Sequence, residues 1–305
     1  MNKRLESLLG FLPERMKISV SRVSNDILNT LEEIRIRICQ PVILLTNTQE
    51  LFLKDASTNT FYVPGTEELK EILERITKSS FYAYLDDIKN GFVTVEGGHR
   101  IGICGRGVMD NGSIGNIKDI SFLNIRIANE KKGISDRILP QILENGAVKN
   151  TLIISPPQAG KTTLLRDITR NISNTLQGGK VSLIDERGEI AAIYNGIPQN
   201  DIGIRTDVLT GIPKSDGMIL AIRSLSPTVL ITDELGSCKE VDAVFTAINS
   251  GVKIITTVHG EDEMEIQKRE DLKSLFQNRV FQKIIILNAS KKDRIFKIMN
   301  GGELR

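Results

Sequence analysis

The chain has 305 residues, 40% of them hydrophobic and 26% charged, which is enough for two globular domains of ordinary soluble composition. Forty Lys and Arg face 38 Asp and Glu, and a net charge of +2 disfavours a protein that grips nucleic acid by charge. The cysteines Cys39, Cys104 and Cys238 form no C-x-x-C, which argues against a metal cluster or disulfide framework and fits a reducing cytosol.

The N-terminal segment predicts neither a signal peptide nor a membrane anchor. The leucines of MNKRLESLLGFLPERM are interrupted by Glu6, and the run ends at Pro13. No stretch approaches the roughly 20 apolar residues that a spanning helix needs. We therefore expect a cytoplasmic protein with no transmembrane segment of its own, which could still dock on a membrane protein.

The N-terminal half predicts a small α+β domain. Alternation and β-branched content predict strands at 34–39 and 42–45. Apolar residues at helical spacing predict an amphipathic helix at 67–76. The stretch GFVTVEGGHRIGICGRGV, residues 91–108, predicts short strands joined by tight turns, with a hairpin signal at Gly97-Gly98.

A polar EKKG at 130–133 follows the strand-like residues 123–128 and predicts a domain boundary, giving domains 1–132 and 133–305. A short helix is expected at 134–143. Beyond it, apolar runs alternate with helices, and the runs lack the alternation of half-exposed strands, as parallel strands covered by helices should. The expected strands are 151–154, 181–184, 228–232, 253–258 and 283–287.

The sequence TLIISPPQAGKTTLL, residues 151–165, predicts a phosphate-binding loop between a buried strand and a helix. Backbone N–H groups at a helix start attract phosphate, and Gly160 allows close approach. Lys161 would reach the β- and γ-phosphates of ATP, and the Thr162 hydroxyl would bind Mg²⁺. Ser155 stands where the full motif has its first glycine. The expected nucleotide-binding residues are Pro157, Gln158, Ala159, Gly160, Lys161, Thr162 and Thr163. The predicted fold is a RecA-like P-loop domain preceded by a smaller α+β domain.

A second signal is TVLITDELG, an apolar strand that ends in Asp233-Glu234. At the carboxyl end of a parallel strand these acids face the ligand crevice. We expect Asp233 to hold the metal with Thr162, and Glu234 to polarise the attacking water. A further cluster, VSLIDERGEI, makes Glu189 an alternative base, and the sequence leaves the choice between Glu189 and Glu234 open.

The strand 253–258 leads to His259, which is well placed to sense the γ-phosphate by hydrogen bonding. Hydrolysis also needs positive charge on the transition state, often an arginine from a neighbouring subunit. The candidates in the C-terminal half are Arg187, Arg205 and Arg223, and those in the N-terminal half are Arg100, Arg106 and Arg126.

These segments resemble the secretion ATPase superfamily, the ring motors of type II and type IV secretion. LIDERGEI resembles its acidic box, with Asp185, Glu186 and Glu189 on the acidic positions. Glu234 matches the essential Glu of the second nucleotide motif, and His259 matches the histidine of the histidine box.

A nearer resemblance is to the sporulation branch, the stage III sporulation protein AA family, over nearly the whole chain. The matching segments are GFVTVEGGHRIGICGRGV, DISFLNIRIA, GKTTLLRD, LIDERGEI and SPTVLITDELG. Generic ATPases lack the first two. The chain departs from the family at Ser155-Pro156-Pro157, where Gly-Pro-Pro is usual, and Arg223 lies one position from the arginine usually seen ahead of the Pro matched by Pro227. The effect of Ser155 on turnover therefore stays open.

The resemblance implies a Mg²⁺-dependent mother-cell ATPase that powers or assembles a channel between mother cell and forespore. Its partners would be the membrane proteins of that channel and further copies of itself, six in a ring by family analogy. Two alternatives remain: an ATP-binding scaffold with little turnover, which Ser155 favours, and a recombinase-like ATPase stimulated by nucleic acid. The near-neutral charge and 5% aromatic content oppose the second.

Overall fold

The computed structural model describes residues 3–78, 80, 84, 87–88, 91–110, 112–144, 146–157, 159–288 and 297–301. The chain divides into two compact units. The first runs to Asn129 and includes the later segment Ala192–Gln199, and the second comprises Glu130–Ala191 and Asn200–Arg305. The domain boundary expected between residues 132 and 133 stays a prediction. Within the described parts of the chain, no helix is both long and apolar enough to span a membrane.

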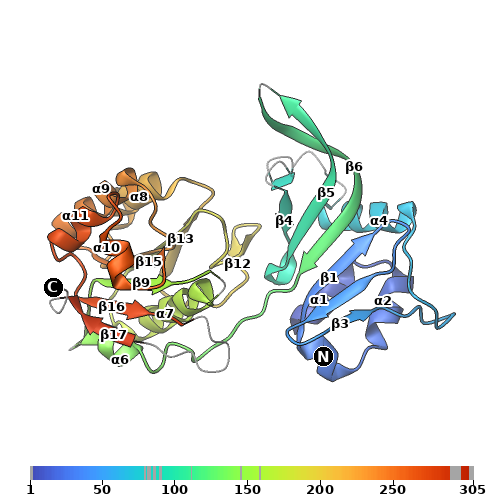
Figure 1. Cartoon of the computed structure of the whole chain (residues 1–305), viewed down its shortest axis with the longest axis horizontal. Coiled ribbons are helices and arrows are strands. Elements are labelled where there is room, and N and C mark those ends of the chain that lie inside the picture. Colours follow the sequence, from blue (N-terminus) through green and yellow to red (C-terminus); the bar gives the residue numbers. More distant parts are fainter. Residues whose placement is uncertain are drawn as a thin grey trace. The chain divides into compact units, whose positions relative to one another are not determined.

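The first unit is a six-stranded antiparallel sheet with helices packed on it (Figure 1). The strands, in spatial order, are β3 (Glu50–Phe52), β2 (Ile43–Thr46), β1 (Leu31–Arg37), β6 (Ser113–Arg126), β5 (Arg100–Asp110) and β4 (Phe92–Thr94). Its helices include α1 (Lys3–Phe11), α2 (Glu14–Ser21), α3 (Asn25–Asn29) and α4 (Thr66–Ile76). The helix expected at 67–76 and the strands expected at 34–39 and 42–45 are confirmed to within three residues.

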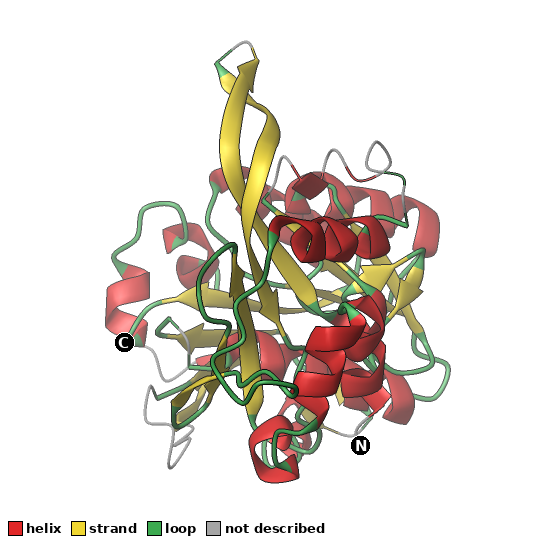
Figure 2. Cartoon of the chain, turned by 90° about the vertical axis from the view of Figure 1, so that its right-hand side faces the viewer, coloured by secondary structure: helices red, strands yellow, loops and turns green. Residues whose placement is uncertain are grey.

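The glycine-rich stretch forms its turn where the sequence predicts one. Val95 donates its backbone N–H to the carbonyl of His99 at 2.9 Å across the short 3₁₀ turn Glu96–Gly98. Gly97 and Gly98 have φ angles of 84° and 79°, which residues with a Cβ rarely adopt. The expectation of short strands at 91–108 is wrong beyond this turn, because β5 has 11 residues. It pairs with the 14 residues of β6, and the two extend as a two-stranded ribbon past the rest of their sheet (Figure 2).

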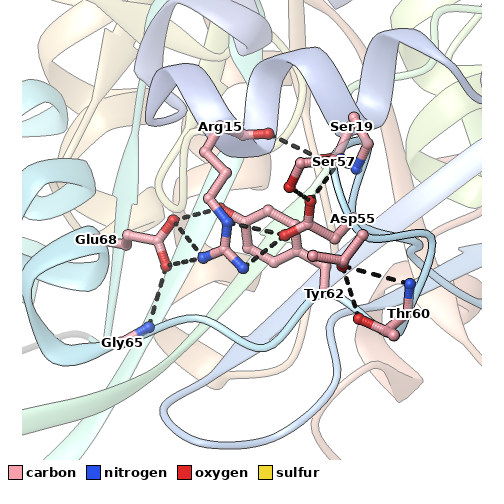
Figure 3. Close-up of polar contacts among 10 residues, drawn as sticks. Arg15, Ser19, Asp55, Ser57, Thr60, Tyr62, Gly65 and Glu68 are labelled. Carbon is pink, nitrogen blue, oxygen red and sulfur yellow. Dashed lines mark hydrogen bonds and ion pairs between the residues drawn. The ribbon is translucent and has the colours of Figure 1, made fainter.

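A polar cluster joins α2, the loop 54–61 and α4 within the first unit (Figure 3). The Arg15 guanidinium lies 4.3 Å from the centroid of the Tyr62 ring, donates to Asp55 at 2.8 Å and pairs with Glu68 at 3.1 Å. Tyr62 donates its hydroxyl to Glu68. Asp55 also accepts from the backbone and hydroxyl of Ser57. The cluster fixes three segments that are distant in sequence.

The second unit is built on a seven-stranded sheet, parallel except at one edge. In spatial order its strands are β13 (Thr206–Thr210), β10 (Val181–Asp185), β14 (Val229–Thr232), β15 (Lys253–His259), β9 (Thr151–Ser155), β16 (Lys283–Ile286) and β17 (Lys297–Asn300). Its helices are α6 (Leu139–Ile142), α7 (Lys161–Thr175), α8 (Lys214–Leu225), α9 (Cys238–Asn249), α10 (Glu263–Gln267) and α11 (Lys273–Gln277), and β7 (Leu143–Glu144) pairs with β8 (Ala147–Val148).

The sheet of the second unit is covered on both faces, which explains its continuous apolar strands. Alternate strand residues such as Leu152 and Leu230 share one core cluster with Met218 of α8 and Val244 of α9. Helix α7 lies on the opposite side of the sheet from α8 and α9 (Figure 1). All five strands expected here are confirmed to within one residue. The helix expected at 134–143 is shorter, because only the four residues of α6 are α-helical.

One hairpin in the C-terminal half belongs to the first unit. Strands β11 (Ile193–Tyr194) and β12 (Ile197–Pro198) are joined at Asn195-Gly196, whose φ values of 49° and 76° suit the Asn-Gly turn. Within the first unit, Gln199 accepts a hydrogen bond from the backbone N–H of Gly97 at 2.9 Å. The chain therefore passes from the second unit into the first and back at this hairpin.

Candidate functional site

The loop between β9 and α7 has the backbone that close approach of an anion requires. Strand β9 is buried throughout, and Gly160 at the helix start has φ 90° and ψ 24°, a left-handed conformation natural to glycine. Lys161 is the first residue of α7, so Thr162 and Thr163 lie in its first turn, where backbone N–H groups have no acceptor within the helix. Pro157 is exposed and Ala159 buried, whereas Gln158 lies outside the described residues.

Ser155 does not need the conformational freedom of the glycine usual at its position. It is the last residue of β9, pairs in register with His259 of β15, and is not among the described residues with positive φ. Its side chain is fully buried, and its hydroxyl donates to the carbonyl of Pro156 at 2.9 Å. A serine therefore fits this strand end without a left-handed backbone, and its effect on turnover stays a prediction.

The order of the strands brings three sequence-predicted groups together. Strand β15 lies between β9, which leads into the loop, and β14, which leads to Asp233 and Glu234. All three strands run parallel, so their carboxyl ends meet at one edge of the sheet. His259 ends the middle strand and therefore stands between the loop and the two acids.

Glu234 connects the loop lysine and the histidine. Its Oε2 atom lies 3.1 Å from Nζ of Lys161 and 3.1 Å from Nε2 of His259. The other ring nitrogen of His259, Nδ1, lies 3.3 Å from the carbonyl oxygen of Ser155. An anion that approached Lys161 would therefore compete with Glu234 for the lysine.

Burial and charge act in opposite directions on this group of residues. Burial would raise the pKa of the Glu234 carboxyl, but the Lys161 charge and hydrogen bond, with a smaller effect of His259, hold that pKa below its usual range. Burial lowers the pKa of the Lys161 ammonium, and this effect exceeds the opposing charge and hydrogen bond of Glu234. The Lys161 side chain is 11% exposed, whereas the Glu234 side chain is 40% exposed. Glu234 is therefore a carboxylate at neutral pH.

Asp233 has the environment of a cation ligand. Its Oδ1 atom is buried and accepts no hydrogen bond from the residues that the structure describes. Burial raises the pKa of Asp233 to about 6, Lys214 opposes that shift, and the charges of Asp185 and Glu189 add to it. A buried carboxylate oxygen near the first turn of α7, 3.7 Å from the Lys214 ammonium and therefore beyond hydrogen-bond distance of it, fits an Mg²⁺ that would take its other ligands from Thr162, water and phosphate.

The acids after β10 have a different arrangement. The buried Asp185 carboxylate accepts the backbone N–H groups of Glu189, Ile190 and Ala191 at 2.8–3.2 Å. Arg166 of α7 donates to the carbonyls of Glu189 and Ile190, at 2.7 Å each. Asp185 and Arg166 therefore fix the backbone of this loop, and Glu189 acts on Asp233 through its charge. Sequence reasoning did not single out Arg166.

The three candidate arginines of the second unit occupy different places. Arg187 is exposed in the turn after β10, at the same edge of the sheet as Asp185. Arg223 is exposed in the last turn of α8, roughly 14 Å along the helix from its first residue. Arg205 donates to the carbonyls of Ser173 and Asn174, near the far end of α7 from the loop. Within one chain Arg205 and Arg223 are thus away from Glu234, and their action on a neighbouring subunit stays a prediction.

The N-terminal candidates each have a partner within the first unit. Arg100 lies over the ring of Phe92, 3.9 Å from its centroid. Arg106 donates to Asp119 at 2.7 Å, and Arg126 lies 3.9 Å from Glu33. A role for any of them in catalysis is a prediction that these contacts leave untested.

Besides Arg166, sequence reasoning missed Lys214. Lys214, the first residue of α8, lies 3.7 Å from Asp233 and 3.3 Å from Glu240, and it donates to the backbone carbonyl of Glu234. Its side chain is 14% exposed. The only local signal is a lysine after a Gly-Ile-Pro turn, which does not specify a partner.

Comparisons with known proteins agree with this picture. The chain matches the family described as Sporulation stage III, protein AA over residues 2–301. It is 41% identical over 291 residues to stage III sporulation protein AA of Bacillus subtilis (strain 168), covering 94% of this chain and 92% of that protein.

Two solved structures are similar in fold. The ATPase DotB of Legionella pneumophila has a TM-score of 0.62 at 17% identity, over 95% of this chain and 83% of its own. The pilus retraction motor PilT with bound ADP has a TM-score of 0.60 at 15% identity, over 90% and 81%. The predicted fold, a P-loop α/β domain preceded by a smaller α+β domain, is confirmed.

Proposed function

Because this chain belongs to the sporulation stage III protein AA family, we propose that it is a Mg²⁺-dependent ATPase. The observation that carries the proposal is the contact of Glu234 with both Lys161 and His259, each at 3.1 Å, beside a loop that ends in a left-handed glycine. Glu234, the proposed base, lies within hydrogen-bond reach of both the proposed phosphate-binding cation and the proposed sensor.

The side chains divide the work of phosphoryl transfer to water. The triphosphate binds at the first turn of α7 and competes with Glu234 for Lys161, because both are anions. Once that contact is broken, Glu234 is free to orient and polarise the attacking water. His259 follows the movement through its own contact with Glu234. Mg²⁺, held by Thr162 and Asp233, would supply positive charge to the phosphate oxygens.

The first test is nucleotide binding by Lys161→Ala. Removal of the ammonium should abolish measurable binding of a fluorescent ATP analogue with Mg²⁺, because the loop loses its main charge contact with phosphate. Lys180→Ala, which alters an exposed lysine of the same unit, should bind like the unmodified chain. The ATPase proposal would be wrong if the unmodified chain bound no adenine nucleotide.

The second test separates binding from turnover. Glu234→Gln should bind ATP at least as tightly as the unmodified chain, since Lys161 loses the anion that competes with phosphate. Its steady-state ATPase rate should fall by about 10²–10³, corresponding to ~2.7–4 kcal/mol of lost transition-state stabilisation. An unchanged rate in Glu234→Gln, with a loss in Glu189→Gln, would assign the base to Glu189.

The wider role follows from the family. We propose that copies of the chain form a ring, with six subunits expected, and that the ring powers or assembles a channel across the envelope between mother cell and forespore. In this role it would work on the mother-cell side, peripheral to membrane proteins of the channel. ATP hydrolysis insensitive to added DNA and RNA would support this proposal over a recombinase-like function.

A further inference from the structure

Lys214 stands at the centre of the acids that end β14. Its ammonium donates to the backbone carbonyl of Glu234 and lies 3.3 Å from the carboxylate of Glu240 and 3.7 Å from that of Asp233. All three partners lie between the end of β14 and the first turn of α9. One lysine on α8 thus contacts the segment that carries the proposed metal ligand and the proposed base.

Two contacts of α8 and the turn before it with β10 fix the position of Lys214. The turn before α8 is tied to the end of β10, where Gly211 donates its N–H to the carbonyl of Glu186 at 3.2 Å. Helix α8 packs so closely on β10 that a Cβ at Gly217 would lie 2.8 Å from the Ile184 side chain. A glycine at this position therefore permits the approach that brings Lys214 to the acids.

Glu240 links the lysine to the backbone after the base. Its Oε2 atom accepts the N–H groups of Gly236 and Ser237 at 2.7 and 3.0 Å, and its Oε1 faces Lys214. Segment 233–237 is thereby held at one end by the lysine and at the other by the glutamate. Three acids gathered in a partly buried space repel one another, and Lys214 supplies the opposing charge.

We propose that Lys214 is a positioning residue for hydrolysis, which keeps the Asp233 carboxylate and the Glu234 backbone in register with the phosphate-binding loop. It acts through those two residues and has no contact of its own with the reacting atoms. The proposal rests on the ATPase function proposed above. It assigns to α8 a part in the reaction that the sequence motifs of the nucleotide site do not contain.

The experiment compares steady-state ATPase kinetics of Lys214→Met with the unmodified chain. The kcat should fall by at least ~10-fold, because the base and the metal ligand lose their fixed position. The KM for ATP should stay within roughly threefold, because the contacts of Lys214 given above are with Asp233, the Glu234 backbone and Glu240. A general loss of folding would instead lower thermal stability and nucleotide binding together.

Three further variants make the result decisive. Lys214→Arg keeps the charge and should recover kcat to within roughly threefold of the unmodified chain. Glu240→Gln keeps an oxygen for the backbone N–H groups but removes the charge facing Lys214, so kcat should fall by a few-fold even if Lys214→Met does not fold. Lys239→Met, an exposed neighbour on α9, should have unmodified kinetics.

A wild-type kcat in a folded Lys214→Met, or in Glu240→Gln should Lys214→Met not fold, would overturn the positioning role. So would a Lys214→Arg variant that is folded but as slow as Lys214→Met. These outcomes are distinct from failure of the ATPase proposal, in which the unmodified chain itself shows no ATP turnover. Turnover by the unmodified chain must therefore be measured first.

Discussion

At the scale of residues, hydrogen bonds and an ion pair to the buried carboxylate of Asp55 outweigh the cost of burying its charge. Asp55 in the first unit is 3% exposed, and hydrogen bonds from the Ser57 hydroxyl and backbone, followed by Arg15, hold its pKa below the usual range. Burial, reinforced by the hydrogen bond to Glu68, raises the pKa of Tyr62. The cluster of Figure 3 is therefore stable with Asp55 ionised and Tyr62 protonated.

The Asp55 cluster predicts a pH-dependent part of the unfolding free energy. Because the pKa of Asp55 is lower in the folded than in the unfolded chain, its ionisation stabilises the fold above the unfolded value of about 3.9. That contribution disappears as pH falls through the lower, folded pKa. The difference in urea unfolding free energy between the unmodified chain and Asp55→Asn should thus shrink from pH 7 to pH 3.

The matched control is Asp26→Asn, which alters an exposed acid of the same unit. The difference between this variant and the unmodified chain should be small at every pH, since surface substitutions usually change stability by less than about 0.5 kcal/mol. An Asp55→Asn difference that is independent of pH would show that the carboxylate charge contributes nothing to the fold.

At the scale of elements, α7 connects the phosphate-binding loop to two segments that lie close in sequence to points where the chain passes from one unit to the other. Its first residue is Lys161, Arg166 holds the loop that leads into the hairpin 193–198, and Asp167 holds the segment that follows Asn129. The buried Asp167 accepts from the N–H of Ser135 at 2.9 Å and from Arg170 at 2.7 Å. Burial would raise the pKa of Asp167, but these hydrogen bonds outweigh it and lower that pKa.

We expect Asp167→Asn to lower the unfolding free energy of the second unit by about 2–4 kcal/mol, because Arg170 loses its charged partner and an amide donor then faces the donors of Ser135. Denaturant unfolding followed by circular dichroism measures the effect. Asp136→Asn, on the exposed acid next to Ser135, is the control and should change stability by less than about 0.5 kcal/mol. Equal losses in the two variants would contradict the role of the buried contact.

At the scale of the whole molecule, the two units are joined by three passages of the chain, at residues 129–130, 191–192 and 199–200. The last two enclose the hairpin 193–198, which lies in the first unit, while the loop 186–191 immediately before it lies in the second. The net charge of +2 gives no reason to expect binding of nucleic acid. Self-association is the interaction that the proposed function requires.

If a neighbouring subunit supplies the arginine that stabilises the transition state, ATPase activity per chain should rise with protein concentration. The rise should coincide with assembly measured by analytical ultracentrifugation under the same nucleotide conditions. Arg187→Ala, Arg205→Ala and Arg223→Ala test which arginine is responsible, and the responsible variant should assemble normally but hydrolyse slowly. Full activity in a monomer would exclude this arrangement.

The sequence by itself determined the fold class, the strands of the second unit and the start of α7 at Lys161, because each has a local signal. Continuous apolar runs mark buried strands, and a Gly-Lys-Thr after such a strand marks the start of a helix that binds phosphate. It also placed Asp233, Glu234 and His259 at strand ends, since the end of an apolar run is readable from the chain alone.

Only the tertiary structure decided which strand ends are neighbours. The position of β15 between β9 and β14 puts His259 against Glu234, although no local period in the sequence encodes strand order. The same holds for Lys214, whose partners lie about 20 residues further along the chain, and for the hairpin 193–198, which joins the first unit from within the C-terminal half. Such contacts depend on the packing of distant segments, which periodicity and motif spacing do not specify.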